Sequence, residues 1–242
     1  MISKVEGFIM SEVPYGDTSK IINVLTKEHG LIGIICKGSK SLKSKNRATT
    51  LRFTYAIFNI YYKENKLSTL IDAEIIDNLI NIKNDIVLIS YLNYLTELTN
   101  QVVKQGDEKE IYAIFINAIL LINKGFNPMV VTNIVEVKYL EYLGVFINLD
   151  SCSKCGSNKD IVTISFNDGG LICKNCYQNE EIVDLKMVRI LRNYLYVDLE
   201  KISKIDIDNN LVKKINLFLD LYYEQYTGLY LQSKKFLKNM ID

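Results

Sequence analysis

Four cysteines give this chain its clearest chemical signal. They form two Cys-x-x-Cys pairs, Cys152 with Cys155 and Cys173 with Cys176, and seventeen residues separate the pairs. This is the ligand spacing of a four-thiolate zinc site, in which the sulfurs converge on the ion at about 2.3 Å. Two residues between paired cysteines allow a tight turn that aims both sulfurs at one point. The spacing therefore predicts one bound Zn²⁺ ion.

The residues between the two pairs predict a β-hairpin that brings the pairs together. The apolar runs 161–166 and 171–172 flank Asn167-Asp168-Gly169-Gly170, a sequence typical of a tight turn. Two disulfides would need an oxidising compartment, and a thioredoxin-like redox pair would open a helix after a strand; the sequence favours neither. Since four thiolates close the coordination shell, the predicted zinc is structural and takes no part in catalysis.

Residues suited to catalysis are scarce. The sequence holds one histidine, His29, whose place in a short turn between two predicted strands favours an exposed residue over a general base. Lys37-Gly38-Ser39 lacks the glycine spacing of a phosphate-binding loop. Asp72, Glu74 and Asp77 are expected to face solvent rather than to hold a metal ion. We therefore expect a protein that is not an enzyme.

Length and charge set wider limits. At 242 residues the chain is longer than a usual single domain, which predicts two domains and a small metal module. The sequence shows no signal peptide and no apolar run long enough to span a membrane, so we expect a cytoplasmic protein. The net charge is only +1, so any surface for nucleic acid must be local. The fifth cysteine, Cys36, lies in a strand-like run and is expected to be a small buried residue.

The first part of the chain predicts a small β-barrel. Five short runs rich in β-branched and aromatic residues are separated by turns that contain glycine, proline or asparagine. The runs cover residues 3–10, 21–26, 31–36, 53–62 and 67–71. A five-stranded OB-fold is the leading interpretation of residues 1–79, and an SH3-like barrel is the alternative that the pattern leaves open.

The rest of the chain predicts a helical domain, residues 80–150 and 181–242, into which a zinc-binding module, residues 151–180, is inserted. Apolar residues recur with a helical period after residue 86 and again after residue 112, with Gly106-Asp107 as the break. Asn127-Pro128, Asp184 and Asp208 are suited to begin three further helices. The predicted fold class is therefore α+β and multidomain.

Cations concentrate in one predicted loop of the barrel. No acidic residue lies between Glu28 and Glu64, and the segment after the third strand contains Lys37, Lys40, Lys43, Lys45, Arg47 and Arg52. Such cations can follow a phosphate backbone without reading its sequence. Nearby tyrosines are candidates for stacking on bases, although in a barrel they can equally be core residues: Tyr15, Tyr55, Tyr61 and Tyr62. The six cations together with Tyr55 form the predicted DNA-binding site.

Aromatic residues form a stripe near the C-terminus. Phe218, Tyr222, Tyr226 and Tyr230 recur every four residues along a predicted long helix, and Lys234, Lys235 and Lys238 follow. Core packing is the ordinary explanation of such a stripe. The alternative is a docking groove for an acidic peptide that ends in a hydrophobic residue, with Phe218, Tyr222, Tyr226, Lys234 and Lys235 as its contacts.

The order of these parts resembles that of one family. Residues similar to the N-terminal sequence of the RecO recombination mediators are Glu6-Gly7-Phe8-Ile9-Met10-Ser11, Tyr15-Gly16-Asp17-Thr18-Ser19-Lys20, Glu28-His29-Gly30-Leu31 and Lys37-Gly38. The later cysteine pairs fit as well, so the resemblance covers essentially the full length. It implies an N-terminal OB-fold, a helical domain and a four-cysteine zinc module. On this resemblance the family's basic surface falls on the six cations of residues 37–52, and its zinc ligands fall on the four paired cysteines.

The resemblance also implies a function and partners. A RecO-like protein is expected to bind single- and double-stranded DNA and to anneal complementary strands. With RecR, it is expected to help load RecA onto DNA that single-strand-binding protein covers. The expected acidic peptide is the C-terminal tail of single-strand-binding protein, and the expected location is the nucleoid region of the cytoplasm. The competing class is a zinc-ribbon adaptor between proteins, or a transcription-associated factor, that does not anneal DNA.

Overall fold

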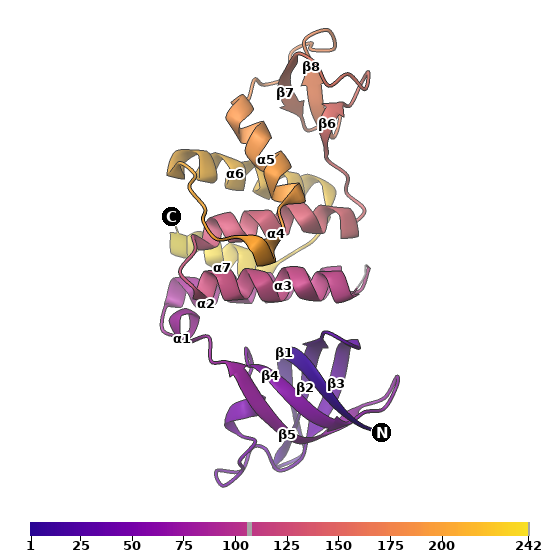
Figure 1. Cartoon of the computed structure of the whole chain (residues 1–242), viewed down its shortest axis with the longest axis vertical. Coiled ribbons are helices and arrows are strands. Elements are labelled where there is room, and N and C mark those ends of the chain that lie inside the picture. The colour runs from indigo at the N-terminus through magenta and orange to yellow at the C-terminus, as the bar shows by residue number, and fades with distance from the viewer. Residues whose placement is uncertain (106–107, 242) are drawn as a thin grey trace. The chain divides into compact units, whose positions relative to one another are not determined.

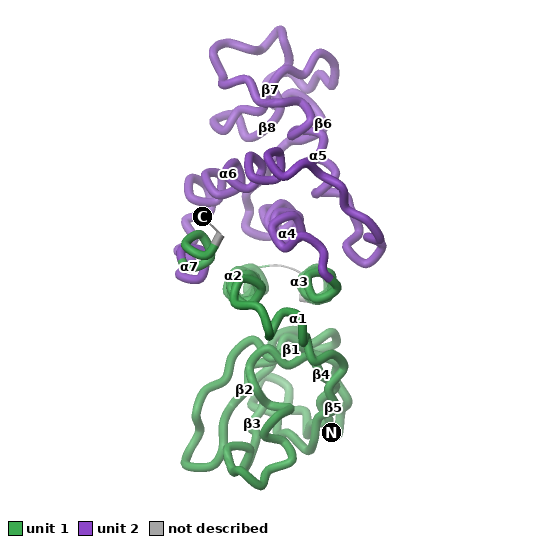
Figure 2. The backbone as a smooth tube through the Cα atoms, turned by 90° about the vertical axis from the view of Figure 1, so that its left-hand side faces the viewer, with its two compact units in different colours: residues 1–124, 236–242 green, residues 125–235 purple. Residues whose placement is uncertain are grey.

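The computed structural model of the chain describes residues 1–105 and 108–241. The chain forms two compact units, which Figure 2 shows in green and purple. Unit 1 consists of Met1–Lys124 with Phe236–Asp242, and unit 2 consists of Gly125–Lys235. The Gly106-Asp107 break predicted between two helices lies outside the described residues. No helix in the described part of the chain is long and apolar enough to cross a membrane.

Unit 1 begins with a closed barrel of five strands (Figure 1). The strands are β1 (Ile2–Tyr15), β2 (Ser19–Thr26), β3 (Gly30–Cys36), β4 (Tyr55–Tyr61) and β5 (Ser68–Asp77), and the order around the barrel is β1-β2-β3-β5-β4. Neighbouring strands are antiparallel except for β3 and β5, which are parallel. A five-stranded barrel of this size is the predicted OB-fold, and the prediction is confirmed.

The barrel closes around alternate apolar side chains, because successive residues of a strand point to opposite faces. The buried core consists of Val5, Ile9, Ile22, Val24, Ile34, Cys36, Ala56, Phe58, Ile60 and Leu70. Cys36 is therefore a small buried residue, as predicted, and burial raises the pKa of its thiol to about 12. A thiol in that environment is protonated and inert at neutral pH.

Three helices complete the described part of unit 1 before residue 124: α1 (Ile80–Lys83), α2 (Ile86–Val102) and α3 (Glu108–Asn123). Helix α3 packs on the barrel. The rings of Phe115 and Phe8 meet edge to face with centroids 5.1 Å apart. Beside them, the hydroxyls of Tyr112 and Tyr55 both donate to Glu6 Oε1, at 2.8 and 2.5 Å. An apolar contact and a partly buried pair of hydrogen bonds thus fix this helix to the barrel wall.

Unit 2 combines helices α4 (Pro128–Tyr142), α5 (Leu185–Tyr196) and α6 (Asn209–Tyr226) with a three-stranded sheet. The predicted starts of all three helices are confirmed, since Asn127, Asp184 and Asp208 each accept hydrogen bonds from backbone N–H groups of the first turn. The sheet has the order β6-β8-β7, from Asn148–Cys152, Gly170–Cys173 and Ile161–Ser165. Its β7–β8 hairpin was predicted; β6 was not.

The predicted long C-terminal helix is two helices. Helix α6 ends at Tyr226, Gly228 adopts φ +61°, and α7 (Gln232–Ile241) begins afresh. A left-handed glycine directly after a helix is a common terminator, because no Cβ opposes that backbone conformation. Tyr230 therefore lies between the helices and does not continue the aromatic stripe.

Candidate metal centre and nucleic-acid interface

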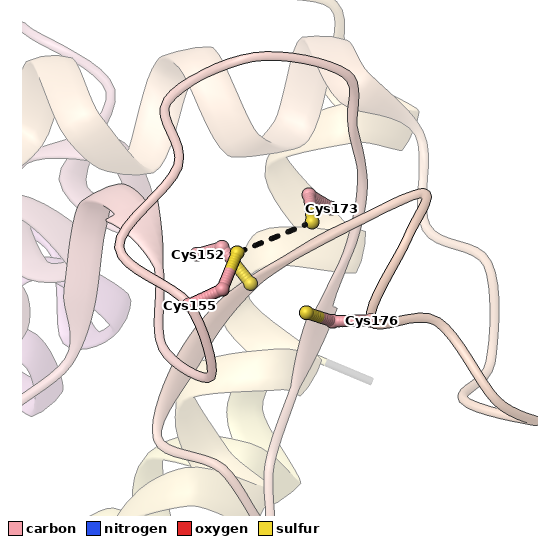
Figure 3. A group of neighbouring side chains, drawn as sticks. All are labelled: Cys152, Cys155, Cys173 and Cys176. Carbon is pink, nitrogen blue, oxygen red and sulfur yellow. Dashed lines mark hydrogen bonds between the residues drawn. The ribbon is translucent and has the colours of Figure 1, made fainter.

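The four paired cysteines converge at one end of the small sheet. Cys152 ends β6, Cys173 ends β8, and Cys155 and Cys176 each follow in a tight turn. In the first turn Gly156 N–H donates to the carbonyl of Cys152 at 2.8 Å with Gly156 at φ +73°. In the second, Cys176 N–H donates to the carbonyl of Cys173 at 3.0 Å. Two short turns thus present four sulfurs to a common point (Figure 3).

The geometry fits one tetrahedral metal ion. The four sulfurs lie within 4.8 Å of one another, and Cys155 Sγ is 3.6 Å from Cys173 Sγ. Metal–sulfur bonds of about 2.3 Å in a tetrahedron place sulfurs about 3.8 Å apart. None of the described cysteines is in a disulfide. The four cysteines thus form a possible metal site whose coordination shell would be complete without water or substrate.

The thiols of this cluster hydrogen-bond to one another and shift one another's pKa values. Burial raises the pKa of Cys152, but backbone hydrogen bonds from Cys173, Cys155 and Lys154 outweigh it and lower the pKa to about 6. Hydrogen bonding to Cys155, with burial, raises the pKa of Cys176 to about 12. Four thiolates this close repel one another unless a cation neutralises them, and a divalent ion at the centre would deprotonate all four. The donor set therefore suits a thiophilic metal.

The segment that carries the four cysteines is attached to the helices of unit 2 by its β7–β8 hairpin. Phe166, just after β7, packs against Phe218 and Tyr222 of α6 with centroids 4.7 and 5.9 Å apart. The Tyr226 hydroxyl donates to the carbonyl of Phe166 at 2.5 Å, and the Tyr222 hydroxyl donates to that of Phe146 at 3.1 Å. Phe218 and Tyr222 are 5% and 2% exposed. Both residues therefore belong to the core, which is the ordinary explanation of the stripe, and the alternative docking groove is not open at these two positions.

The two lysines predicted to flank that groove have contacts within the protein instead. Lys234 reaches Glu136 Oε1 at 2.5 Å and Asp220 Oδ1 at 2.7 Å, so it serves a buried ion-pair cluster. Lys235 is exposed and lies over the ring of Tyr230, 4.4 Å from its centroid. The prediction that Lys234 contacts a docked peptide is therefore wrong, since its charge is already neutralised by two carboxylates.

The predicted DNA-binding loop leaves the barrel at the end of β3. Five of its cations have exposed side chains: Lys37, Lys40, Lys43, Lys45 and Arg47. Its backbone is held by several bonds, among them Gly38 N–H to Ser19 Oγ at 3.1 Å and Lys40 N–H to the Thr18 carbonyl at 2.9 Å. In the described ranges 1–105 and 108–241, none of the five cations forms an ion pair. The loop therefore presents uncompensated positive charge at one end of the barrel.

Arg52 and Tyr55 differ from the rest of the predicted site. Arg52 Nε donates to the carbonyl of Met10 at 3.2 Å, and its guanidinium lies 4.3 Å from the centroid of Phe53, so this side chain is partly engaged within the protein. Tyr55 is 7% exposed, and its hydroxyl donates to Glu6. Burial, followed by the bond to Glu6, raises the pKa of Tyr55. The prediction that Tyr55 stacks on a base is wrong, because its ring lies between the barrel and α3.

Two family models match this chain over almost all of its length. The model described as Recombination protein O N terminal matches residues 1–79, and that described as Recombination protein O C terminal matches residues 83–235. This chain belongs to the RecO family. Three relatives named DNA repair protein RecO come from Bacillus pumilus strain SAFR-032, Bacillus subtilis strain 168 and Listeria monocytogenes serotype 4b strain CLIP80459. They are 34%, 32% and 30% identical to it, and each alignment covers 99% of this chain and 95% of the relative.

One feature of this RecO-family DNA repair protein was missed in the sequence. His29, expected to be an exposed turn residue, is half-buried and stacks on Tyr62 with ring centroids 4.1 Å apart and an interplanar angle of 17°. Lys63 and Lys66 follow Tyr62 in the β4–β5 hairpin. The two lysines of this hairpin were a signal for a second basic surface, but nothing in the sequence indicated that the turn holding His29 meets this hairpin.

Proposed function

We propose that this chain is a recombination mediator that binds single- and double-stranded DNA and anneals complementary strands without catalysing a reaction. Residues 1–79 would be the DNA-binding domain, and residues 80–150 and 181–242 a helical domain carrying the metal module of residues 151–180. The observation that carries the proposal is the set of exposed, unpaired cations at the end of β3. Membership of a family whose relatives are named DNA repair protein supports it.

The chemistry of annealing fits such a loop. Two single strands repel one another through their phosphates, and lysine and arginine side chains release the counterions that condense on each backbone. The loop lies beside Tyr15, which ends β1 and is 52% exposed. Lys40 Nζ reaches the carbonyl of the next residue, Gly16, at 3.4 Å. Tyr15 therefore replaces Tyr55 in our proposal as the ring on which a base stacks near the cations.

The partners and the metal are part of the same proposal. RecR would act with this chain in loading RecA, and the C-terminal tail of single-strand-binding protein would recruit it to covered DNA. A net charge of only +1 supports a division of labour, in which partners supply part of the DNA contact. One Zn²⁺ ion held by the four cysteines would stabilise the module without chemistry of its own.

The test is a salt titration of binding to a labelled single-stranded oligonucleotide. Lys40→Ala, Lys43→Ala and Lys45→Ala in one variant should weaken binding to all sequences. If each lysine contacts one phosphate, the slope of log K against log salt should fall by about 2, at roughly 0.7 per phosphate of single-stranded DNA.

The matched control removes three exposed lysines elsewhere: Lys186, Lys213 and Lys214. It changes the net charge equally, so it should leave the slope within about 0.5 of wild type. Equal slopes for the loop variant and this control would reject the loop as the DNA-binding surface. A wild-type protein that binds DNA but does not accelerate the pairing of complementary oligonucleotides would reject annealing.

A further inference from the structure

One face of helix α6 is covered by nothing that the structure describes. The other face of this helix, which runs from Asn209 to Tyr226, is buried in unit 2 through residues such as Ile215 and Leu219. On the open face Leu217 and Leu221 are 60% and 49% exposed. Residues four apart lie one above the other on the same side of a helix. The two leucines therefore form a single apolar patch near the middle of α6.

Charges of opposite sign flank this patch. Lys213 and Lys214 lie on its N-terminal side and Glu224 lies on its C-terminal side, and all three residues are exposed. Lys213 is four residues before Leu217 and Glu224 is three residues after Leu221, so both share the face of the leucines. Within residues 1–105 and 108–241, none of the three charged residues forms an ion pair.

This order of charges is unfavourable within a single helix. A helix carries partial positive charge at its N-terminus and partial negative charge at its C-terminus, so carboxylates stabilise the first turn and cations the last. Apart from the capping Asp208, α6 has no acidic residue in its first turn, and it has no basic residue in its last. Glu224 instead lies in the last turn. A second helix that ran antiparallel along this face would reverse the effect, because it would bring its own negative end to the side of Lys213.

We propose that α6 pairs with α6 of a second copy of this chain, antiparallel and about a twofold axis at the level of Leu219. Such an axis brings each residue close to the one equally far beyond position 219, so Leu217 contacts Leu221 of the second copy. Lys213 falls within one residue of the level of Glu224 of the second copy. Since positions 213 and 224 are eleven residues apart, about three turns, they also lie on the same flank of the helix.

The self-complementary pattern favours a second copy over another partner. Any apolar surface would cover the leucines, but here one helix supplies both the patch and the opposite charges, at spacings that match when the helix is turned end for end. The symmetry repeats each contact, so the interface has four leucines at its centre and a lysine–glutamate pair at each end. This inference does not depend on the proposed function.

The expected dimer is weak. One pair of helices buries less surface than a standard stable interface of about 1,200 to 2,000 Å², so we expect a dissociation constant in the micromolar range. Measurements of DNA binding at nanomolar protein lie far below that range. Substitutions at Lys213 and Lys214 therefore do not disturb such measurements through the dimer.

Sedimentation equilibrium of the full chain tests the contact. The average mass of wild type should rise toward that of two chains between about 1 and about 100 µM. Leu217→Ser with Leu221→Ser should keep the mass of one chain throughout. The matched control is Ile80→Ser with Ile86→Ser, whose side chains are 57% and 61% exposed, and it should dimerise like wild type. All four side chains are exposed, so unfolding midpoints should stay close to that of wild type.

Charge reversal tests the antiparallel arrangement. Lys213→Glu brings two carboxylates together at each end of the interface, and Glu224→Lys brings two ammonium groups together, so each change should weaken the dimer at least about tenfold. A mixture of these two variants should form a mixed dimer more tightly than either forms alone, because opposite charges then meet at both ends. A chain that carries both changes should recover to within about threefold of wild type.

Three results would overturn the proposal. A wild type that keeps the mass of one chain at about 100 µM would mean that a different partner, or water alone, covers the leucines. Dimerisation of the variant with both leucines replaced would move the contact to another face. Failure of the chain with both charge changes to recover, together with no preference for the mixed dimer, would rule out the antiparallel pairing.

Discussion

Lys234 provides the sharpest test of how unit 2 is held together. Its Nζ lies 2.5 Å from Glu136 Oε1 and 2.7 Å from Asp220 Oδ1, and the two carboxylate side chains are 1% and 7% exposed. Lys234→Met keeps an unbranched side chain of similar length but removes the charge. Two buried carboxylates would then lose the cation that contacts both of them, and breaking such a cluster costs about 3 to 5 kcal/mol. We expect a loss of this size in the free energy of unfolding at pH 7.

The effect should depend on pH in a direction set by the lysine. Burial alone lowers the pKa of Lys234, but the carboxylates of Glu136 and Asp220 outweigh it and raise the pKa above its ordinary value. A lysine with a raised pKa in the folded state stabilises it fully below its unfolded pKa, about 10.4, and this contribution is lost as pH rises through the folded pKa. The difference between wild type and variant should therefore be constant near neutral pH and shrink at strongly alkaline pH.

Urea unfolding followed by far-ultraviolet circular dichroism measures this difference. Lys235→Met is the matched control, because the adjacent Lys235 is exposed and contacts only the surface ring of Tyr230 in the interactions described for it. It should change the free energy of unfolding by less than about 0.5 kcal/mol. Equal stability of the two variants at pH 7 would refute the assignment of Lys234 to a buried ion-pair cluster.

Three further predictions follow from local geometry. Metal analysis should find one zinc ion per chain, and Cys152→Ser with Cys155→Ser should abolish it and lower the unfolding midpoint; a metal-free protein of unchanged stability would contradict a structural ion. Asn127→Ala should cost about 1 kcal/mol in urea unfolding through loss of the α4 cap, and no cost would mean that solvent caps the helix equally well. Tyr112→Phe should cost roughly 1 to 2 kcal/mol, because it removes one of two hydroxyls that donate to Glu6, and a neutral result would show that the other donor satisfies this carboxylate.

Features set by neighbouring residues could be predicted from the sequence. The barrel strands follow from runs of β-branched residues between turns, and three helix starts follow from Asn127, Asp184 and Asp208. The cysteine pairs converge because each turn needs only four residues to aim its sulfurs, and in the first turn the left-handed Gly156 follows directly. In each case the determining interactions lie within a few residues along the chain, so local chemistry was sufficient.

Features set by distant contacts could not be predicted in this way. The sequence pattern around Tyr55 is the same whether its ring faces solvent or α3. The contacts that decide between the two are made by Glu6, which lies 49 residues from Tyr55 and 106 residues from Tyr112. Lysine is a residue type that is usually exposed, so the sequence alone places Lys234 on the surface. Its partner Glu136 is 98 residues away along the chain. A stripe of aromatic residues likewise indicates an apolar face of a helix but not what covers it.

The contacts that cover the aromatic residues of α6 attach the four-cysteine cluster to the helices. Phe166 lies in the loop that follows β7, and β7 pairs with β8, which ends at Cys173. On the other side, Asp150 of β6 accepts from Arg192 Nε at 2.7 Å and from the Tyr196 hydroxyl, both on α5. Strand β6, which ends at Cys152, thus contacts α5, and the β7–β8 hairpin, which ends at Cys173, contacts α6. Because the aromatic contacts of α6 require the hairpin to keep its position, we expect a metal ion on the four cysteines to stabilise the packing of unit 2 as well as the small sheet.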